Sequence, residues 1–142
     1  MPDHELDPSR LSALAKARDT RRAYVKQLSE KYQDTRAHRA DVQRRLAVAR
    51  QNAEMYHGFQ RVEADNQIAA LVAEERELTD RLAEIQAETD ATSGEAQEAG
   101  QLYRACLSFA VDQGLPIPPS LAADAATLNR IQMPMAMPGG AS

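Results

Sequence analysis

Apolar residues recur at alternating spacings of three and four along most of this chain. In the first series, which runs from residue 11 to residue 56, ten of 14 positions are apolar or Tyr. Its members are Leu11, Leu14, Arg18, Arg21, Val25, Leu28, Tyr32, Thr35, Arg39, Val42, Leu46, Ala49, Ala53 and Tyr56. A repeat of this length predicts a long helix that packs through a narrow coiled-coil seam.

A second series with the same spacing runs from residue 64 to residue 110, and 11 of its 14 members are apolar or Tyr. It comprises Ala64, Ile68, Leu71, Glu75, Leu78, Leu82, Ile85, Thr89, Thr92, Ala96, Ala99, Tyr103, Cys106 and Ala110. The two series do not join, because Tyr56 and Ala64 are eight residues apart and a continued heptad needs seven. The gap contains Gly58, so it marks either local overwinding of one helix or a reversal of the chain.

Charge segregation favours the reversal. Residues 8–61 carry 13 Lys or Arg against five acids, whereas residues 62–142 carry four Arg against 13 acids. Folding one half back on the other brings opposite charges together.

A reversal between Gly58 and Phe59 places residues whose numbers add to 117 opposite each other, so that every seam position meets a seam position. Ala49 then faces Ile68, and Leu11 faces Cys106. Arg18 and Arg21 fall beside Glu98 and Glu95, and Arg39 falls beside Glu75 and Glu77. The fold class predicted is all-α, a long antiparallel helical hairpin, with one continuous rod-like helix as the alternative.

Local signals give the ends of the hairpin. Asp7 followed by Pro8 is a strong helix start, and Gly114 followed by Leu115 and Pro116 is a typical helix end. Gly94 and Gly100 predict a break or kink within the second helix, since each Gly weakens a helix by about 1 kcal/mol. We therefore expect an N-terminal arm over residues 1–7 and a hairpin over residues 8–114 with its turn near residue 58.

Residues 115–142 are predicted to form a third segment. The sequence PIPPS is an extended linker, Ser120 is a candidate cap for a short helix from Leu121 to about Ile131, and a Met/Pro/Gly tail follows. Apolar side chains in this segment are the candidates for binding a partner protein. They are Met133, Met135, Met137, Leu115 and Ile117.

Candidate chemistry is sparse. Cys106 is the only cysteine and lies on the seam, where a small buried side chain is expected. The three histidines lack metal-ligand spacing, and the row Asp80, Glu84, Glu88 has no accompanying histidine. No phosphate-binding loop or nucleophile motif occurs, so we expect no catalytic residue, no metal, no cofactor and no enzymatic activity.

Arginines in the first helix, among them Arg36, Arg39 and Arg50, raise the question of nucleic-acid binding. If nucleic acid is the partner, Arg44 and Arg45 are the expected phosphate contacts. Interspersed acids and an isoelectric point near 5.4 argue against this partner.

The longest apolar run, Ile68–Ala73, is far shorter than a membrane span, and the first ten residues lack the features of a secretory signal. We expect a cytoplasmic or virion location, without a membrane partner.

Arg outnumbers Lys by 14 to three and Ala is abundant, which indicates a GC-rich bacterial or phage genome. In size and helical style the chain resembles the small accessory proteins of phage particles, such as scaffolding, head-tail or fibre-anchoring components. The predicted function is therefore non-enzymatic assembly through coiled-coil association, as a homo-oligomer or in a larger assembly, with a C-terminal docking arm. The alternatives are a cytosolic helical adaptor or regulator for one partner protein and, less favoured, a basic-helix nucleic-acid binder.

Overall fold

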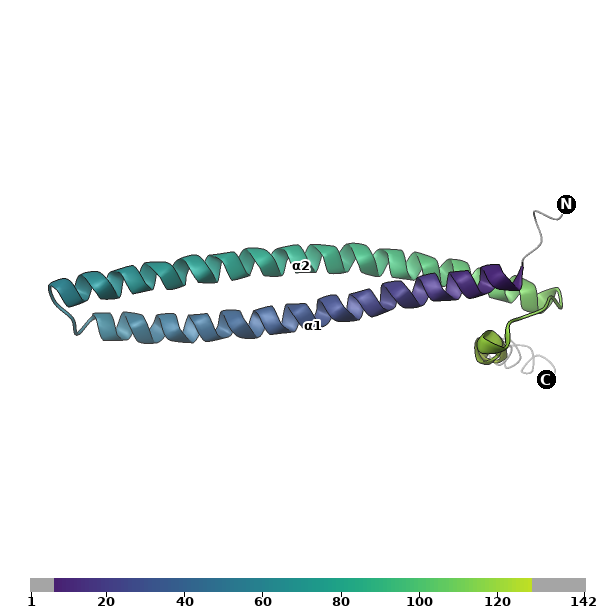
Figure 1. Cartoon of the computed structure of the whole chain (residues 1–142), viewed down its shortest axis with the longest axis horizontal. Helices are drawn as coiled ribbons and strands as arrows, with labels where there is room; N and C mark the ends of the chain where they lie inside the picture. Colours follow the sequence, from purple (N-terminus) through teal and green to yellow (C-terminus); the bar gives the residue numbers. More distant parts are fainter. Residues whose placement is uncertain (1–6, 129–142) are drawn as a thin grey trace, which may run out of the picture. The chain divides into compact units, whose positions relative to one another are not determined.

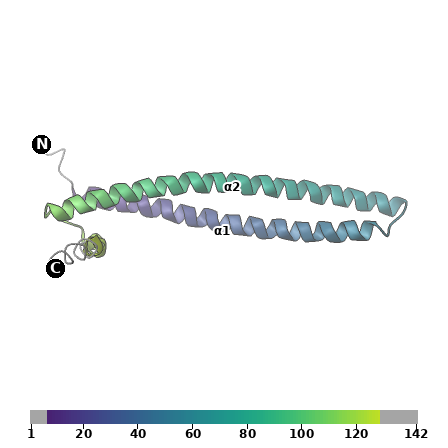
Figure 2. The same ribbon diagram turned by 180° about the vertical axis from the view of Figure 1, so that it is seen from behind.

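The computed structural model describes residues 7–128. It contains two long helices, α1 (Pro8–Ala53) and α2 (Phe59–Asp112), then the 3-10 turn η2 (Pro119–Leu121), which continues as α-helix over residues 122–128. Within the described residues there is no strand, and α1 and α2 run antiparallel side by side (Figures 1 and 2). The predicted all-α hairpin is therefore confirmed, and the single rod is excluded.

The start of α1 follows the sequence prediction. Asp7 accepts a hydrogen bond from the Ser9 backbone N–H through Oδ1 at 2.8 Å, and its carbonyl accepts from Arg10 N at 2.9 Å. The hydrogen bond from Ser9 lowers the pKa of Asp7. The side chain thus caps the Ser9 N–H, which the first turn leaves without a helical partner.

The chain reverses over residues 54–58, at the predicted place. Gly58 has φ +60°, a conformation that costs Gly little, and its carbonyl accepts from the backbone N–H groups of Arg61 and Val62 at the start of α2. The Arg61 guanidinium reaches back to the Ala53 carbonyl at 2.7 Å. The same carbonyl accepts from Tyr56 N at 3.2 Å, so one α2 side chain adds a second hydrogen bond at the end of α1.

Burial follows the two seams. Every seam position within α1 and α2 is buried or half-buried, including the polar Thr35 and Thr92, whereas Tyr56 lies outside both helices and is exposed.

The packing forms two compact units. We call residues 24–92 the turn unit, and residues 7–23 with 93–128 the terminal unit.

The turn unit has the predicted register. Tyr24 donates a hydrogen bond to Glu88, and His38 Nε2 lies 3.2 Å from Glu74 Oε1. Tyr24 and His38 each directly precede an α1 seam residue. Glu88 and Glu74 each lie four positions before the α2 seam residue that the sum of 117 places opposite. A shift by one heptad would also match the seams, and the contact that decides against it is Gln43 Nε2 to Glu75 Oε1 at 3.4 Å. Glu75 lies one position from Glu74, which the sum of 117 places opposite Gln43.

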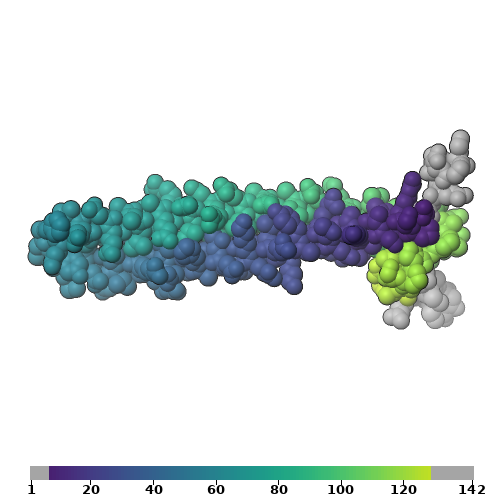
Figure 3. Space-filling view, in the orientation of Figure 1, coloured from purple at the N-terminus to yellow at the C-terminus, as the bar shows by residue number. Residues whose placement is uncertain are grey.

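The terminal unit adds a third element to the hairpin. Leu121 and Ala125, from the C-terminal segment, lie in one buried cluster with Leu11, Leu107 and Ala110. The space-filling view shows the C-terminal segment, coloured yellow-green, against the purple start of α1 (Figure 3). The linker PIPPS was expected to lead to a segment that stands apart from the hairpin, whereas Leu121 and Ala125 pack into the hairpin's core.

The end of α2 is a Schellman motif. Gly114 has φ +67°, its N–H donates to Val111 O at 3.2 Å, and Leu115 N donates to Ala110 O at 2.9 Å. Leu115 also packs against the cluster. The predicted stop at Gly114 is thus confirmed, and it directs the chain back along the hairpin.

Two local predictions were wrong. α2 continues through Gly94 and Gly100 without a break, since seam packing of Thr92 and Tyr103 offsets the weak helix propensity of glycine. Ser120 does not cap the short helix. The helical turn begins at Pro119, two residues before the predicted start at Leu121, and no side chain caps it. The fixed φ of proline suits a first helical position.

Candidate interaction surfaces

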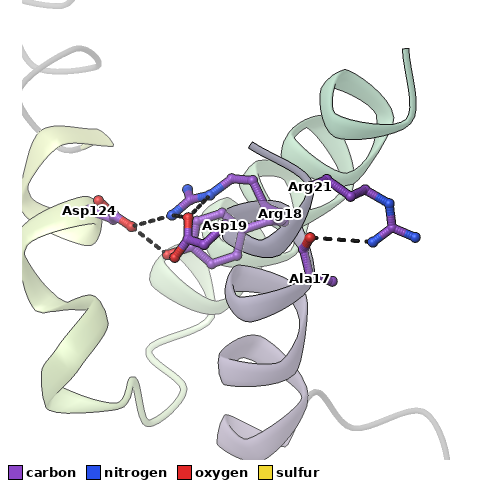
Figure 4. Close-up of polar contacts among 6 residues, drawn as sticks. Ala17, Arg18, Asp19, Arg21 and Asp124 are labelled. Carbon is purple, nitrogen blue, oxygen red and sulfur yellow. Dashed lines mark hydrogen bonds and ion pairs between the residues drawn. The ribbon is translucent and has the colours of Figure 1, made fainter. Parts of the chain in front are cut away.

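A polar cluster joins the hairpin to the C-terminal segment in the terminal unit. Arg18 of α1 lies over the Tyr103 ring, with its guanidinium carbon 4.4 Å from the ring centroid. Its Nη2 is 3.0 Å from Asp19 Oδ1 and 3.8 Å from Asp124 Oδ2 (Figure 4). Arg18 packs against Gly100, where an added methyl group would lie in ordinary van der Waals contact with the Arg18 side chain at 3.8 Å. We call Arg18, Tyr103 and Asp124 the latch.

Tyr103 is the most buried member of the latch, 2% exposed, and its hydroxyl donates to Asp124 Oδ2 at 2.7 Å. Burial, then the hydrogen bond to Asp124, raise the pKa of Tyr103 to about 12. The phenol is therefore neutral at physiological pH. A neutral donor facing a carboxylate serves positioning rather than proton transfer.

Of the two seam arginines in the terminal unit, Arg18 and Arg21, one has its predicted partner. Arg21 Nε lies 3.8 Å from Glu95 Oε2, as expected from the register. Arg18 pairs with Asp19 and Asp124 in place of Glu98. The C-terminal segment, which the hairpin register does not include, brings the second of these acids to Arg18.

Exposed apolar side chains gather around the turn. Among the described residues, five of the eight large exposed hydrophobic side chains lie between residues 48 and 62. They are Val48, Met55, Tyr56, Phe59 and Val62, and we call them the tip patch. Phe59 is 77% exposed and Met55 is 70% exposed. Such a concentration of apolar side chains is typical of a surface that a partner covers.

A shallow groove of about 480 Å³ adjoins the tip patch. Its walls are Arg44, Arg45, Val48, Ala49, Asn52, Gln67 and Leu71. The two arginines, the candidate phosphate contacts, both pair with Asp41, Arg45 at 3.0 Å and Arg44 at 3.3 Å. A shared carboxylate reduces the charge that they offer to a phosphate.

The predicted partner-binding residues fall in two groups. Leu115 and Ile117 are half-buried and pack against the core of the terminal unit. Met133, Met135 and Met137 lie outside the described residues. A role of these five in binding a partner stays a prediction.

Residues considered for chemistry occupy ordinary structural positions. Cys106 is half-buried at the edge of the core cluster. In the predicted carboxylate row, Glu88 accepts the hydrogen bond from Tyr24. Over residues 7–128, no three His, Cys, Asp or Glu side chains are grouped closely enough to hold a metal ion. None of the helices in this range has the length and apolar character to cross a bilayer.

Sequence reasoning missed part of the terminal core. Ala15, Leu107 and Gly100 are buried although none is a seam position. All three follow a seam residue by one or four positions, and so lie on one flank of the hairpin. The overlooked signal was this apolar flank together with Leu121, Ala125 and Leu128, spaced for one face of a third helix.

No protein-family model matches the chain, and no curated protein or solved structure is similar to it.

Proposed function

We propose that this chain is a non-enzymatic assembly protein that associates with further copies of itself, in the manner of small helical accessory components of phage particles. The observation that carries the proposal is the tip patch, five large apolar side chains that residues 7–128 leave exposed. Covering such side chains stabilises an association by about 25 cal/mol per Å² of apolar surface removed from water.

The thin packing of the turn unit supports the same proposal. Its buried residues are seam residues and are few, among them Leu28, Val42, Leu46 and Leu78. A two-helix arrangement with so narrow a core gains much of its stability from neighbours. A cytoplasmic or virion location belongs to this proposal.

Light scattering after size exclusion, over a range of micromolar concentrations, tests the proposal. The wild-type chain is expected to give a defined oligomer. The double variant Met55→Ser with Phe59→Ser should shift that oligomer toward monomer. Leu102→Ser is the control, because Leu102 is also an exposed apolar side chain but lies in the terminal unit, and it should leave the mass unchanged.

Other results would select the alternatives. A monomer that melts cooperatively at these concentrations contradicts self-assembly. If that monomer binds one protein from its host, the adaptor function replaces the assembly function. Submicromolar DNA binding near 150 mM salt that is lost in Arg44→Ala with Arg45→Ala would establish the nucleic-acid function.

A further inference from the structure

The hairpin in the terminal unit forms an apolar groove whose occupant is the chain's own C-terminal segment. Leu11 and Ala110 are fully buried and Leu107 is 1% exposed. All three belong to the cluster that Leu121 and Ala125 complete. The groove is therefore a surface that binds a short helix.

The helix seated in this groove carries a recognisable pattern. Leu121 and Ala125 are buried and Leu128 is half-buried, which gives apolar contacts at positions i, i+4 and i+7. Asp124, at i+3, accepts a hydrogen bond from the Tyr103 hydroxyl and lies 3.8 Å from the Arg18 guanidinium. Apolar anchors at these spacings with one charged group are the pattern by which amphipathic helices bind grooves in other proteins.

The connection between α2 and this helix leaves the helix exchangeable. Residues 115–118 have no regular secondary structure, and Leu-Pro-Ile-Pro contains two residues that lack a backbone N–H. Backbone hydrogen bonds anchor this connection at its ends, from Leu115 to Ala110 and from Leu121 to Pro118. Proline favours extended conformations, so the same connection can lead away from its own groove.

We propose that the groove also docks the C-terminal segment of a second copy, so that neighbouring subunits exchange residues 115–128. The latch contacts that form within one chain then form between two chains. Exchange of an identical element gives an oligomer at little energetic cost, because each contact is replaced by its equivalent. This proposal rests on the proposed self-assembly, and it names a second link between subunits beside the tip patch.

Charge reversal across the latch tests the exchange. In Arg18→Glu the groove repels Asp124, and in Asp124→Arg the segment is repelled by Arg18, so neither variant should exchange with itself. In a mixture, the groove of the Asp124→Arg chain receives the wild-type segment of the Arg18→Glu chain. The groove of the Arg18→Glu chain then receives the segment that carries Asp124→Arg. Both contacts of a mixed dimer are complementary.

Native mass spectrometry of the full-length chains distinguishes mixed from like dimers. Mixed dimers should exceed either like dimer at least tenfold. The control mixture pairs Arg36→Glu with Asp112→Arg, two exposed positions outside the latch, and should give statistical proportions. Statistical proportions in the latch mixture would overturn the exchange.

A second measurement uses only the wild-type chain. Excess synthetic peptide of residues 115–128 competes for the groove and should lower the mass of the wild-type oligomer, whereas the same peptide with Asp124→Arg should not. An unchanged mass with both peptides would overturn the exchange while leaving self-assembly through the tip patch intact. A wild-type chain that never self-associates would contradict the proposed function itself.

Discussion

The Tyr103 hydroxyl donates a 2.7 Å hydrogen bond to the Asp124 carboxylate, and so joins α2 to the C-terminal segment across 21 positions of sequence. Arg18 covers the face of the same ring. Three elements therefore meet at one aromatic side chain.

This relationship predicts a dependence of stability on alkaline pH. The folded pKa of Tyr103 is about 12, above its ordinary value of 10, because burial and the Asp124 carboxylate disfavour the phenolate. The folded chain then binds a proton that the unfolded chain has released. The stability linked to Tyr103 is complete below pH 10 and is lost as the pH rises from 10 to 12.

Thermal melts at several pH values between about 8 and 12 measure this loss. Tyr103→Phe should be less stable than wild type at the lower end of this range but show a weaker decline at the upper end. An equal decline in both proteins would assign the effect to other groups.

Leu107→Ala should lower the free energy of unfolding by about 2–5 kcal/mol, because it opens a cavity at a side chain that is 1% exposed. Leu102→Ala is the matched control in the same helix. Leu102 is 54% exposed, so this change should cost less than about 1 kcal/mol. Chemical denaturation of both variants supplies the comparison, and similar losses would show that the C-terminal segment does not cover Leu107 in solution.

Two glycine substitutions should act with opposite signs. Gly114 has φ +67°, where a side chain is strained, so Gly114→Ala should destabilise the chain by roughly 1 kcal/mol. Gly94 lies inside α2, and a Cβ added there meets no atom within 4 Å. Gly94→Ala should therefore stabilise by about 0.5–1 kcal/mol. Denaturant midpoints decide the signs, and a stabilising Gly114→Ala would contradict the Schellman motif.

Engineered cysteines test the register of the turn unit. In a Cys106→Ser background, Ala49→Cys with Ile68→Cys should oxidise to a disulfide within one chain, since the two positions face each other across the seam. The product migrates as a faster monomer on a non-reducing denaturing gel. In the control, Ala47→Cys replaces Ala49→Cys, and the exposed position 47 should give little intrachain product. Dimers without a faster monomer from the first pair would reject the register.

The turn unit could be predicted from sequence because its determinants are local or periodic. The seams and Gly58 follow from residue type and spacing, and so do two features of the terminal unit, the Asp7 cap and the Gly114 stop. The terminal unit could not be predicted in full. Its third element contacts the hairpin through Leu121, Ala125 and Asp124. The heptad pattern of the hairpin does not indicate which hairpin residues these side chains contact. The partner of Arg18 was missed for that reason.

The tip patch was missed for another reason. Val62 and Phe59 lie in a helix that is rich in apolar residues, so the sequence does not distinguish them from buried residues. They are exposed because neither is a seam position and both lie beside the turn. Seam spacing identifies the residues that are buried, whereas exposure of the remaining apolar residues depends on where the chain reverses.

The terminal unit is built from residues 7–23 and 93–128, which are far apart in the sequence. This separation implies that the terminal unit folds after the turn unit. Contacts near Gly58 close short loops, whereas Leu11 meets Leu107 only after most of the chain is available. During synthesis from the N-terminus, the first turns of α1 emerge long before residues 93–128 exist. The apolar residues of this face therefore wait for their partners throughout that interval, and the core of the terminal unit is the last to close.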